Sequence, residues 1–318
     1  MKFLRHVFAI LFVAGLSSSC GGGDDDFGNL ATVAQQRGFT ALLAASDKAG
    51  ITATLQAENA NVTVFAPTNA AFDTLAKQLG FANAGELVTA LPASDLSKIL
   101  QYHVVSGTKS AADLRAAGAS LQTSYRFEGA PATVRLKTGT GIAVTDAVLA
   151  DATVTTADVR ADNGVIHAVD KVLVPPGVLN VVQMAQANPA TFSSLVGAVV
   201  ATGLAPTLSG AGPFTVFAPV NTAFAAAPQG LTTAQLTSVL TYHVLSGQVL
   251  SSAIPFGTPI ATLDTKTLDG ATVAAQTITI NSNLTITDTT TSAASILATD
   301  VRAVNGVIHV IGKVLIPR

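Results

Sequence analysis

The sequence predicts an α+β chain of two tandem domains, and three observations carry this prediction. Three blocks of sequence occur twice in the same order. The first half of each copy has apolar residues at helical spacing, and the second half has short alternating runs typical of strands. The repeated blocks are TVFAPTNAAF (63–72) with TVFAPVNTAF (215–224), LQYHVVSG (100–107) with LTYHVLSG (240–247), and NGVIHAVDKVLVP (163–175) with NGVIHVIGKVLIP (305–317). Their offsets of 152, 140 and 142 residues are domain-sized, so the repeat indicates two domains rather than a solenoid.

The composition agrees with this organisation and argues against one class of partner. A chain of 318 residues suits two domains of about 150 residues each. Charged residues make up only 11% of the chain and the net charge is −2, so no basic face is available to neutralise a phosphate backbone. We therefore expect no nucleic-acid partner.

The first 19 residues predict a secretory signal peptide. Lys2 and Arg5 precede an apolar run from Phe8 to Leu16, and three serines follow it. This run is too short to span a bilayer as a helix, which needs about 20 apolar residues. We expect an exported chain whose mature part begins near residue 20.

Cys20 is the only cysteine of the chain, so an intramolecular disulfide is impossible. Its position directly after the signal peptide resembles the lipidated cysteine of bacterial lipoproteins. That pattern usually has a leucine three residues before the cysteine, whereas here Ser17 holds that place and Leu16 precedes it. Residues 20–27, which include GGGDDD, are predicted to form a flexible acidic tether. The alternative is an ordinary secreted protein with an unpaired cysteine.

The first block predicts a strand, a corner and a helix. Thr63 to Phe65 form a short β-prone run that Pro67 ends. Thr68 or Asn69 is predicted to cap a helix that carries Phe72 inward.

The second block predicts an amphipathic helix that ends in a Tyr-His pair. Ser94 is the expected cap, and Leu96, Ile99, Leu100 and His103 recur at i, i+3, i+4 and i+7. The second copy has the same stripe at Leu236, Val239, Leu240 and His243.

Both histidines of these stripes are predicted to lie on an apolar face close to a helix end that Gly107 or Gly247 terminates. A histidine in that place can bind one of the last helix carbonyls. We therefore favour a structural role for His103 and His243 over a catalytic or ligand role.

The last block predicts a turn followed by a central strand. The Asn-Gly pair at 163–164 is expected to supply the positive φ angles of a tight turn. The run VIHAVDKVLVP then alternates, and both of its sides are mostly apolar, so the strand should be buried on both faces. Shorter strands are predicted before it, over 133–145 in the first copy and over 276–280 and 283–287 in the second.

One difference between the copies, and the length of the linker between them, can be read directly from the sequence. The first copy has a twelve-residue excess between its first two blocks, which we assign to FANAGELVTALP (81–92). The Pro-Pro-Gly sequence at 175–177 leaves almost no linker, so the two domains are expected to hold a fixed relation.

The three ordered blocks, each found twice, resemble the signatures of the fasciclin domain. TVFAP followed by Asn and Ala-Phe is similar to its first signature, Tyr-His to its central one, and NGVIHxxxKVLxP to its last. The resemblance covers nearly all of residues 28–318 and predicts a first domain at 28–175 and a second at 178–318. It implies two fasciclin-type domains, each with a wedge-shaped β-sandwich core flanked by helices.

No motif in the sequence points to catalysis. The chain lacks an HExxH metal pattern, a GxSxG elbow, a glycine-rich phosphate loop and any cysteine inside the folded part. We therefore predict a protein that is not an enzyme, with no cofactor and no metal site.

The resemblance implies an extracytoplasmic adhesion module that binds a protein, matrix or polysaccharide and touches the membrane only through its lipid anchor. Carried over, the central signature points to Tyr102, His103, Tyr242 and His243 as binding residues. We expect a bacterial cell-envelope location, at the outer membrane or cell surface, or otherwise secretion. A structural envelope spacer and a histidine-dependent metal-binding protein or hydrolase stay open as alternatives.

Overall fold

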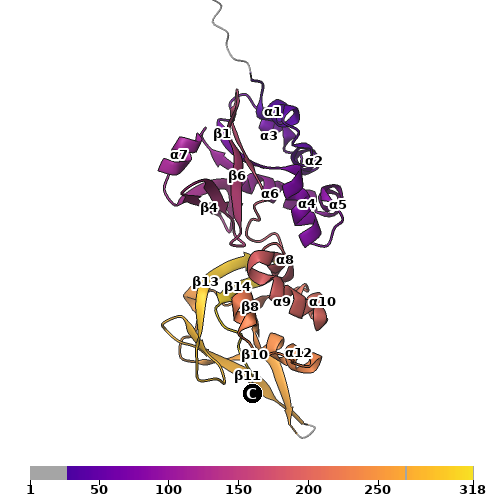
Figure 1. Ribbon diagram of the computed structural model, residues 1–318, viewed down its shortest axis with the longest axis vertical. Coiled ribbons are helices and arrows are strands. Elements are labelled where there is room, and N and C mark those ends of the chain that lie inside the picture. Colours follow the sequence, from indigo (N-terminus) through magenta and orange to yellow (C-terminus); the bar gives the residue numbers. More distant parts are fainter. Residues whose placement is uncertain (1–26, 269–270, 318) are drawn as a thin grey trace, which may run out of the picture.

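The computed structural model describes residues 27–268 and 271–317, so the predicted signal peptide, Cys20 and most of the predicted tether lie outside the described residues. Figure 1 shows two domains stacked along the long axis of the molecule, with most helices of each domain on one side of its strands. Within the described part of the chain, no helix has the length and apolar character needed to cross a membrane.

The first domain starts with helices, continues through a strand and further helices, and ends in strands. Its helices are α1 (Leu30–Gln36), α2 (Thr40–Ala49), α3 (Thr52–Gln56), α4 (Asn69–Gln78), α5 (Ala84–Ala90), α6 (Ala93–Tyr102) and α7 (Ala111–Ala116). Its strands are β1 (Val62–Pro67), β2 (Val104–Ser106), β3 (Ser120–Phe127), β4 (Ala130–Thr138), β5 (Ile142–Thr145), β6 (Asp151–Ala161) and β7 (Gly164–Val169). This order confirms the predicted α+β class.

Strand β7 lies at the centre of the first domain, as the alternation of its sequence predicts. It pairs in parallel with β1 and antiparallel with β6, and all six of its residues are buried. The seven strands close into a ring in the order β1 to β7. One apolar cluster fills the inside of this ring, and a second lies between the ring and the helices.

The second domain repeats this plan with fewer helices and an open sheet. Its helices are α8 (Val181–Gln186), α9 (Pro189–Ala201), α10 (Ala205–Leu208), α11 (Asn221–Ala225) and α12 (Thr233–Tyr242), with a 3-10 turn at Ser251–Ala253. Its strands are β8 (Phe214–Pro219), β9 (Val244–Ser246), β10 (Pro259–Leu268), β11 (Ala271–Ile280), β12 (Thr285–Thr287), β13 (Ala294–Ala303) and β14 (Gly306–Ile311). Among the described residues no ladder joins β9 to β10, and α11 is shorter than its counterpart α4.

Local signals predict some boundaries and miss others. Thr68 caps α4 through its side chain, and α5 lies inside the segment to which we assigned the twelve-residue excess. The prediction that Ser94 caps α6 is wrong, because that helix begins at Ala93, two residues earlier than a Ser94 cap would place it, and has no side-chain cap. Gly107 does not end α6 either, because strand β2 separates them.

The Asn-Gly pair has a different role from the predicted positive-φ turn. Neither Gly164 nor Asn163 has a positive φ. A Cβ on Gly164 would lie 2.3 Å from the carbonyl oxygen of Val62, so glycine is required because β1 passes too close. In the same way, a Cβ on Gly306 would lie 2.2 Å from the carbonyl oxygen of Phe214.

The adjoining asparagine ties two helices to the end of this hairpin. Asn163 Oδ1 accepts from the N–H of Leu30 at 2.8 Å, and its Nδ2 donates to the carbonyls of Leu55 and Ala57. Asn305 makes the equivalent bonds, with Val181 as donor at 2.9 Å. Its acceptors are Leu208 and Gly210.

The two domains are joined by a short and well-bonded segment. Gly177 has a φ of +71°, its N–H donates to the carbonyl of Arg302, and a Cβ on it would lie 2.3 Å from the ring of Phe127. The Arg302 guanidinium lies 5.3 Å from the centroid of the Phe127 ring and forms an ion pair with Glu128.

A buried hydrogen bond joins the domains elsewhere in the junction. Asn188 Nδ2 of the second domain donates to the carbonyl of Val148 in the first, at 2.9 Å. Val148 and Val178 belong to one apolar cluster that runs through both domains. This continuity agrees with the fixed relation that the short linker predicts.

Candidate binding site

The Tyr-His pair of the first domain connects a helix to three strands or strand ends. The Tyr102 hydroxyl donates to the carbonyl of Thr133 on β4 at 2.9 Å. His103 Nδ1 lies 2.8 Å from the carbonyl of Ile99, one turn back in α6, and Nε2 accepts from the N–H of Leu173 at 2.8 Å. The backbone carbonyl of His103 also accepts from the N–H of Phe65 on β1.

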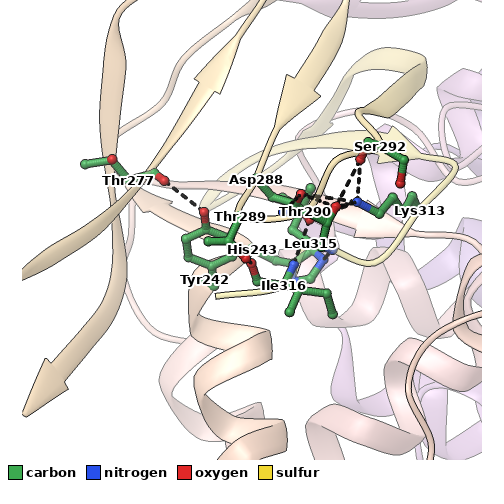
Figure 2. Close-up of polar contacts among 10 residues, drawn as sticks. All are labelled: Tyr242, His243, Thr277, Asp288, Thr289, Thr290, Ser292, Lys313, Leu315 and Ile316. Atoms are coloured by element: carbon green, nitrogen blue, oxygen red, sulfur yellow. Dashed lines mark hydrogen bonds and ion pairs between the residues drawn. The ribbon is translucent and has the colours of Figure 1, made fainter. Parts of the chain in front are cut away.

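The second pair repeats these bonds, and Figure 2 shows those to Thr277 and Leu315. The Tyr242 hydroxyl donates to the carbonyl of Thr277 at 2.8 Å. His243 Nδ1 lies 2.7 Å from the carbonyl of Val239, and Nε2 accepts from the N–H of Leu315 at 2.9 Å. The four side chains of the two pairs are at most 2% exposed.

These bonds determine the proton positions of both histidines. A backbone N–H can only donate, so Nε2 is unprotonated and Nδ1 carries the proton that it donates to the helix carbonyl. Burial lowers the pKa of His103 and of His243 to about 4. Burial likewise raises the pKa of Tyr102. Each histidine is therefore a neutral group whose two ring nitrogens are both used by the fold.

The second repeated histidine supports a bend in the neighbouring strand. His167 Nδ1 accepts from the N–H of Asp158, a residue with φ of +58° in β6, and Nε2 lies 2.9 Å from the carbonyl of Lys109. His309 has the matching contacts with Asp300 and Val249. Burial lowers the pKa of His309.

Nothing in the described ranges, 27–268 and 271–317, assembles a metal site. No group of three or more His, Cys, Asp or Glu side chains is positioned to hold an ion there. The bonds of the four core histidines explain this, because their nitrogens face backbone groups rather than one another.

Sequence reasoning missed a repeated aspartate that organises the loop before the last long strand of each domain. Asp146 Oδ1 accepts from the N–H groups of Val148 and Ala150, and Oδ2 from that of Val174. Asp288 occupies the same place and accepts from the N–H groups of Thr290 and Ile316. A signal was available, because both aspartates share the 142-residue offset of the last block.

The junction also forms an open cleft that faces solvent. It has a volume of about 380 Å³ and is lined by both domains, with Glu128 from the first and Gln248 and Arg302 from the second. The guanidinium of Arg302 is already engaged by Glu128 and Phe127, so it is not free for an added anion. The contacts of Arg302 in this cleft therefore serve to join the two domains.

The chain is similar to known proteins of one domain family. A family model described as the fasciclin domain matches residues 37–175 and 190–317. Protein sll1483 of Synechocystis sp. is 36% identical over 149 residues, which cover 44% of this chain and 74% of that protein. Transforming growth factor-beta-induced protein ig-h3 of Sus scrofa is 35% identical over 167 residues, which cover 51% of this chain and only 22% of that protein.

A solved structure of a domain pair is similar to the chain over both domains. It is a FAS1 domain pair from the insect cell adhesion molecule fasciclin I, with 17% identity and a TM-score of 0.43. The match covers 90% of this chain and 95% of that one.

Proposed function

Because the chain belongs to the fasciclin domain family, we propose that it is a non-catalytic adhesion module of the bacterial cell envelope. Its two tandem domains would bind an extracellular protein, matrix or polysaccharide. The observation that carries the proposal is the joined pair itself. Two related domains held by the Arg302–Glu128 ion pair and the Asn188–Val148 hydrogen bond present two surfaces in a constant relation.

The tyrosines and histidines of the central signature are proposed to shape this module from within. Their side chains are buried and their polar atoms are bonded to backbone groups, so substitution would change the helix and strand positions first. The same bonding supports the absence of catalysis, because a general base needs a ring nitrogen free to reach substrate.

We also propose that the chain is exported through residues 1–19 and anchored by lipid at Cys20. The basic start, the apolar run and the position of the cysteine support this. Residues 28–175 and 178–318 are proposed as the two domains. Metabolic labelling with a palmitate analogue should tag the wild type and leave Cys20→Ser unlabelled, and equal labelling of both would contradict the anchor.

The adhesion role is tested with beads that carry the full mature chain, passed over arrays of matrix proteins and purified polysaccharides. We expect saturable attachment to one ligand class and competition by the soluble chain. Beads with denatured chain are the control. Attachment no stronger than this control across both arrays would contradict adhesion and leave the envelope spacer as the better interpretation.

A further inference from the structure

The two domains differ most in the layer outside their helices. In the first domain, α5 lies against α2 and α4 and buries Leu87 and Val88 to 1% and 8% exposure. In the second, the chain runs from α11 to α12 through residues 226–232 without a helix. A groove of about 420 Å³ is open at this place. We call it the α9–α12 groove; its lining includes Ala198, Phe224, Ala227, Leu231, Leu236 and Val314.

Matched residues show that the groove is the position that α5 covers in the first domain. Asn69 Oδ1 accepts from the N–H of Ala41, and Asn221 Oδ1 accepts from that of Ser194, so α2 and α9 correspond in register. Ala45 is 0% exposed, whereas its counterpart Ala198 is half-buried and lines the groove. Phe72 and its counterpart Phe224 differ in the same direction, from 2% exposed to half-buried.

The second domain also lacks the group that fastens α5. Lys48 Nζ donates to the carbonyls of Val88 and Thr89 at 2.9 and 2.5 Å, and thereby binds the end of α5. In the register given by the asparagine bonds, Ala201 replaces that lysine. The groove therefore has the apolar floor of a helix-binding site without the cation that retains a helix from the same chain.

Charge narrows the class of occupant. From residue 172 to residue 263 the sequence contains no Asp, Glu, Lys or Arg, and this stretch supplies all helices of the second domain. Without basic residues the surface has no attraction for an anionic membrane. A charged face on the bound molecule would lose its hydration here without gaining an oppositely charged side chain from these helices. Cores of protein interfaces, by contrast, are depleted in charge and rich in apolar groups.

We propose that the α9–α12 groove binds a short amphipathic helix of a partner protein, in the place that α5 holds in the first domain. The helix presents an uncharged face with two neighbouring apolar side chains, as Leu87 and Val88 do in α5. This deepens the proposed adhesion function, on which it rests, by naming the ligand class of the second domain.

The α5 segment itself is the probe. A fluorescein-labelled peptide of residues 80–92 is titrated with the full mature chain and followed by anisotropy. The control peptide carries Leu87→Asp and Val88→Asp. Two chain variants place a carboxylate in the groove, Leu231→Asp and the more exposed Ala225→Glu, and Leu297→Asp, at a residue 59% exposed on β13, is the matched surface control.

We expect saturable binding of the wild-type peptide and binding weaker by roughly tenfold or more for the control peptide and for both groove variants. Leu297→Asp should bind as the wild type does. Equal affinity for Ala225→Glu and wild type, or no saturation up to about millimolar chain, would overturn the proposal. A wild-type dimer in sedimentation that Ala225→Glu dissociates would also overturn it, because a second copy would then occupy the groove.

The bead assay separates this proposal from the adhesion function. Peptide binding by a chain that attaches to no array component would leave the groove site standing and remove the adhesion role. If Ala225→Glu leaves adhesion unchanged and no peptide binds, the groove site is removed and the adhesion role is kept.

Discussion

The loop after Asp146 in the first domain and the loop after Asp288 in the second begin at equivalent aspartates. The first loop is apolar and packed, whereas the second is polar and largely exposed. Residues 147–150 are Ala-Val-Leu-Ala and pack in the junction, where the carbonyl of Val148 accepts from Asn188. Residues 289–292 are Thr-Thr-Thr-Ser and lie at least partly exposed. The aspartate fixes the loop backbone in both domains. The side chains differ because only the first loop packs against the other domain.

The second loop replaces interdomain packing with a lysine. Lys313 Nζ forms an ion pair with Asp288 at 3.0 Å and donates to Thr290 and to the carbonyl of Ser292 (Figure 2). In the first loop no such ion pair forms, and burial raises the pKa of Asp146 to about 7 against the effect of its backbone donors. The pKa of Asp288 is lowered instead: burial raises it, but bonds from Thr290, Ile316 and Lys313 outweigh burial.

The largest expected effect tests whether the two domains share their backbone constraint. Gly164→Ala and Gly306→Ala each place a methyl group within 2.3 Å of a carbonyl oxygen. We expect each to cost about 3–5 kcal/mol and to abolish cooperative unfolding of its own domain. Gly139→Ala, which meets nothing within 4 Å, is the control. Hydrogen exchange measured by mass spectrometry gives the loss domain by domain, and equal tolerance of all three substitutions would contradict the steric argument.

Acidification should change the stability of the two domains by different amounts. The histidines have pKa values of about 4 in the fold and about 6.5 unfolded, so their stabilisation is lost as pH falls from 6.5 towards 4. Asp146 has the opposite sign, because its pKa of about 7 lies above the unfolded value of 3.8 and acidification therefore stabilises the first domain over that range. Asp288 has a lowered pKa and brings no such gain.

Between pH 7 and pH 4 we therefore expect the second domain to lose more stability than the first, by about 3 kcal/mol. Hydrogen exchange corrected for intrinsic rates checks this. Asp146→Asn should remove most of the difference, and an equal loss in both domains of the wild type would contradict it.

Removal of a core histidine should weaken both domains alike. His103→Ala and His243→Ala leave a cavity and two unpaired backbone groups, for which we expect about 2–3 kcal/mol each. Tyr102→Phe and Tyr242→Phe should cost about 1 kcal/mol, because only one hydrogen bond is lost. Zinc should not shift any melting temperature. Full stability of the histidine variants with loss of bead attachment would instead make these residues contacts.

Exchanging loop chemistry tests the role of the junction. Val148 is 1% exposed, so Val148→Thr buries a hydroxyl and should cost about 1–2 kcal/mol and loosen the contact with Asn188. Thr291→Val, at an exposed position of the other loop, should change the free energy of unfolding by less than about 0.5 kcal/mol. Equal effects of the two changes would mean that the apolar loop does not serve the junction.

The smallest expected effect concerns the lysine that replaces this packing. Lys313→Met should lower the free energy of unfolding by about 1 kcal/mol. The loss is small because Asp288 keeps its backbone donors and the ammonium is partly exposed. Lys171→Met, at the matching residue of the first domain, should cost less. Denaturant unfolding gives both values, and a larger cost for Lys171→Met would contradict the comparison of the two loops.

Much of each domain follows from the sequence, because its elements depend on contacts between residues close together in the chain. The stripe of Leu96, Ile99, Leu100 and His103 predicts a buried helix face, and all four are at most 4% exposed. The alternation after residue 164 predicts the buried strand β7. The burial of His103 and His243 also followed, since both lie on an apolar helix face near a helix end.

Tertiary structure alone decided the features that depend on distant segments. The Asn-Gly pair has the composition of a positive-φ turn, yet its glycine is required by β1, about 100 residues earlier, at the carbonyl of Val62. The open α9–α12 groove likewise follows from which helix is absent above it. The repeat by itself determined two related domains, each with a helix-rich first half and a strand-rich second half, and local periodicity determined the buried faces of α6 and β7. The junction and the exposed surfaces required the structure, because packing between segments far apart in sequence leaves no periodic pattern in the chain.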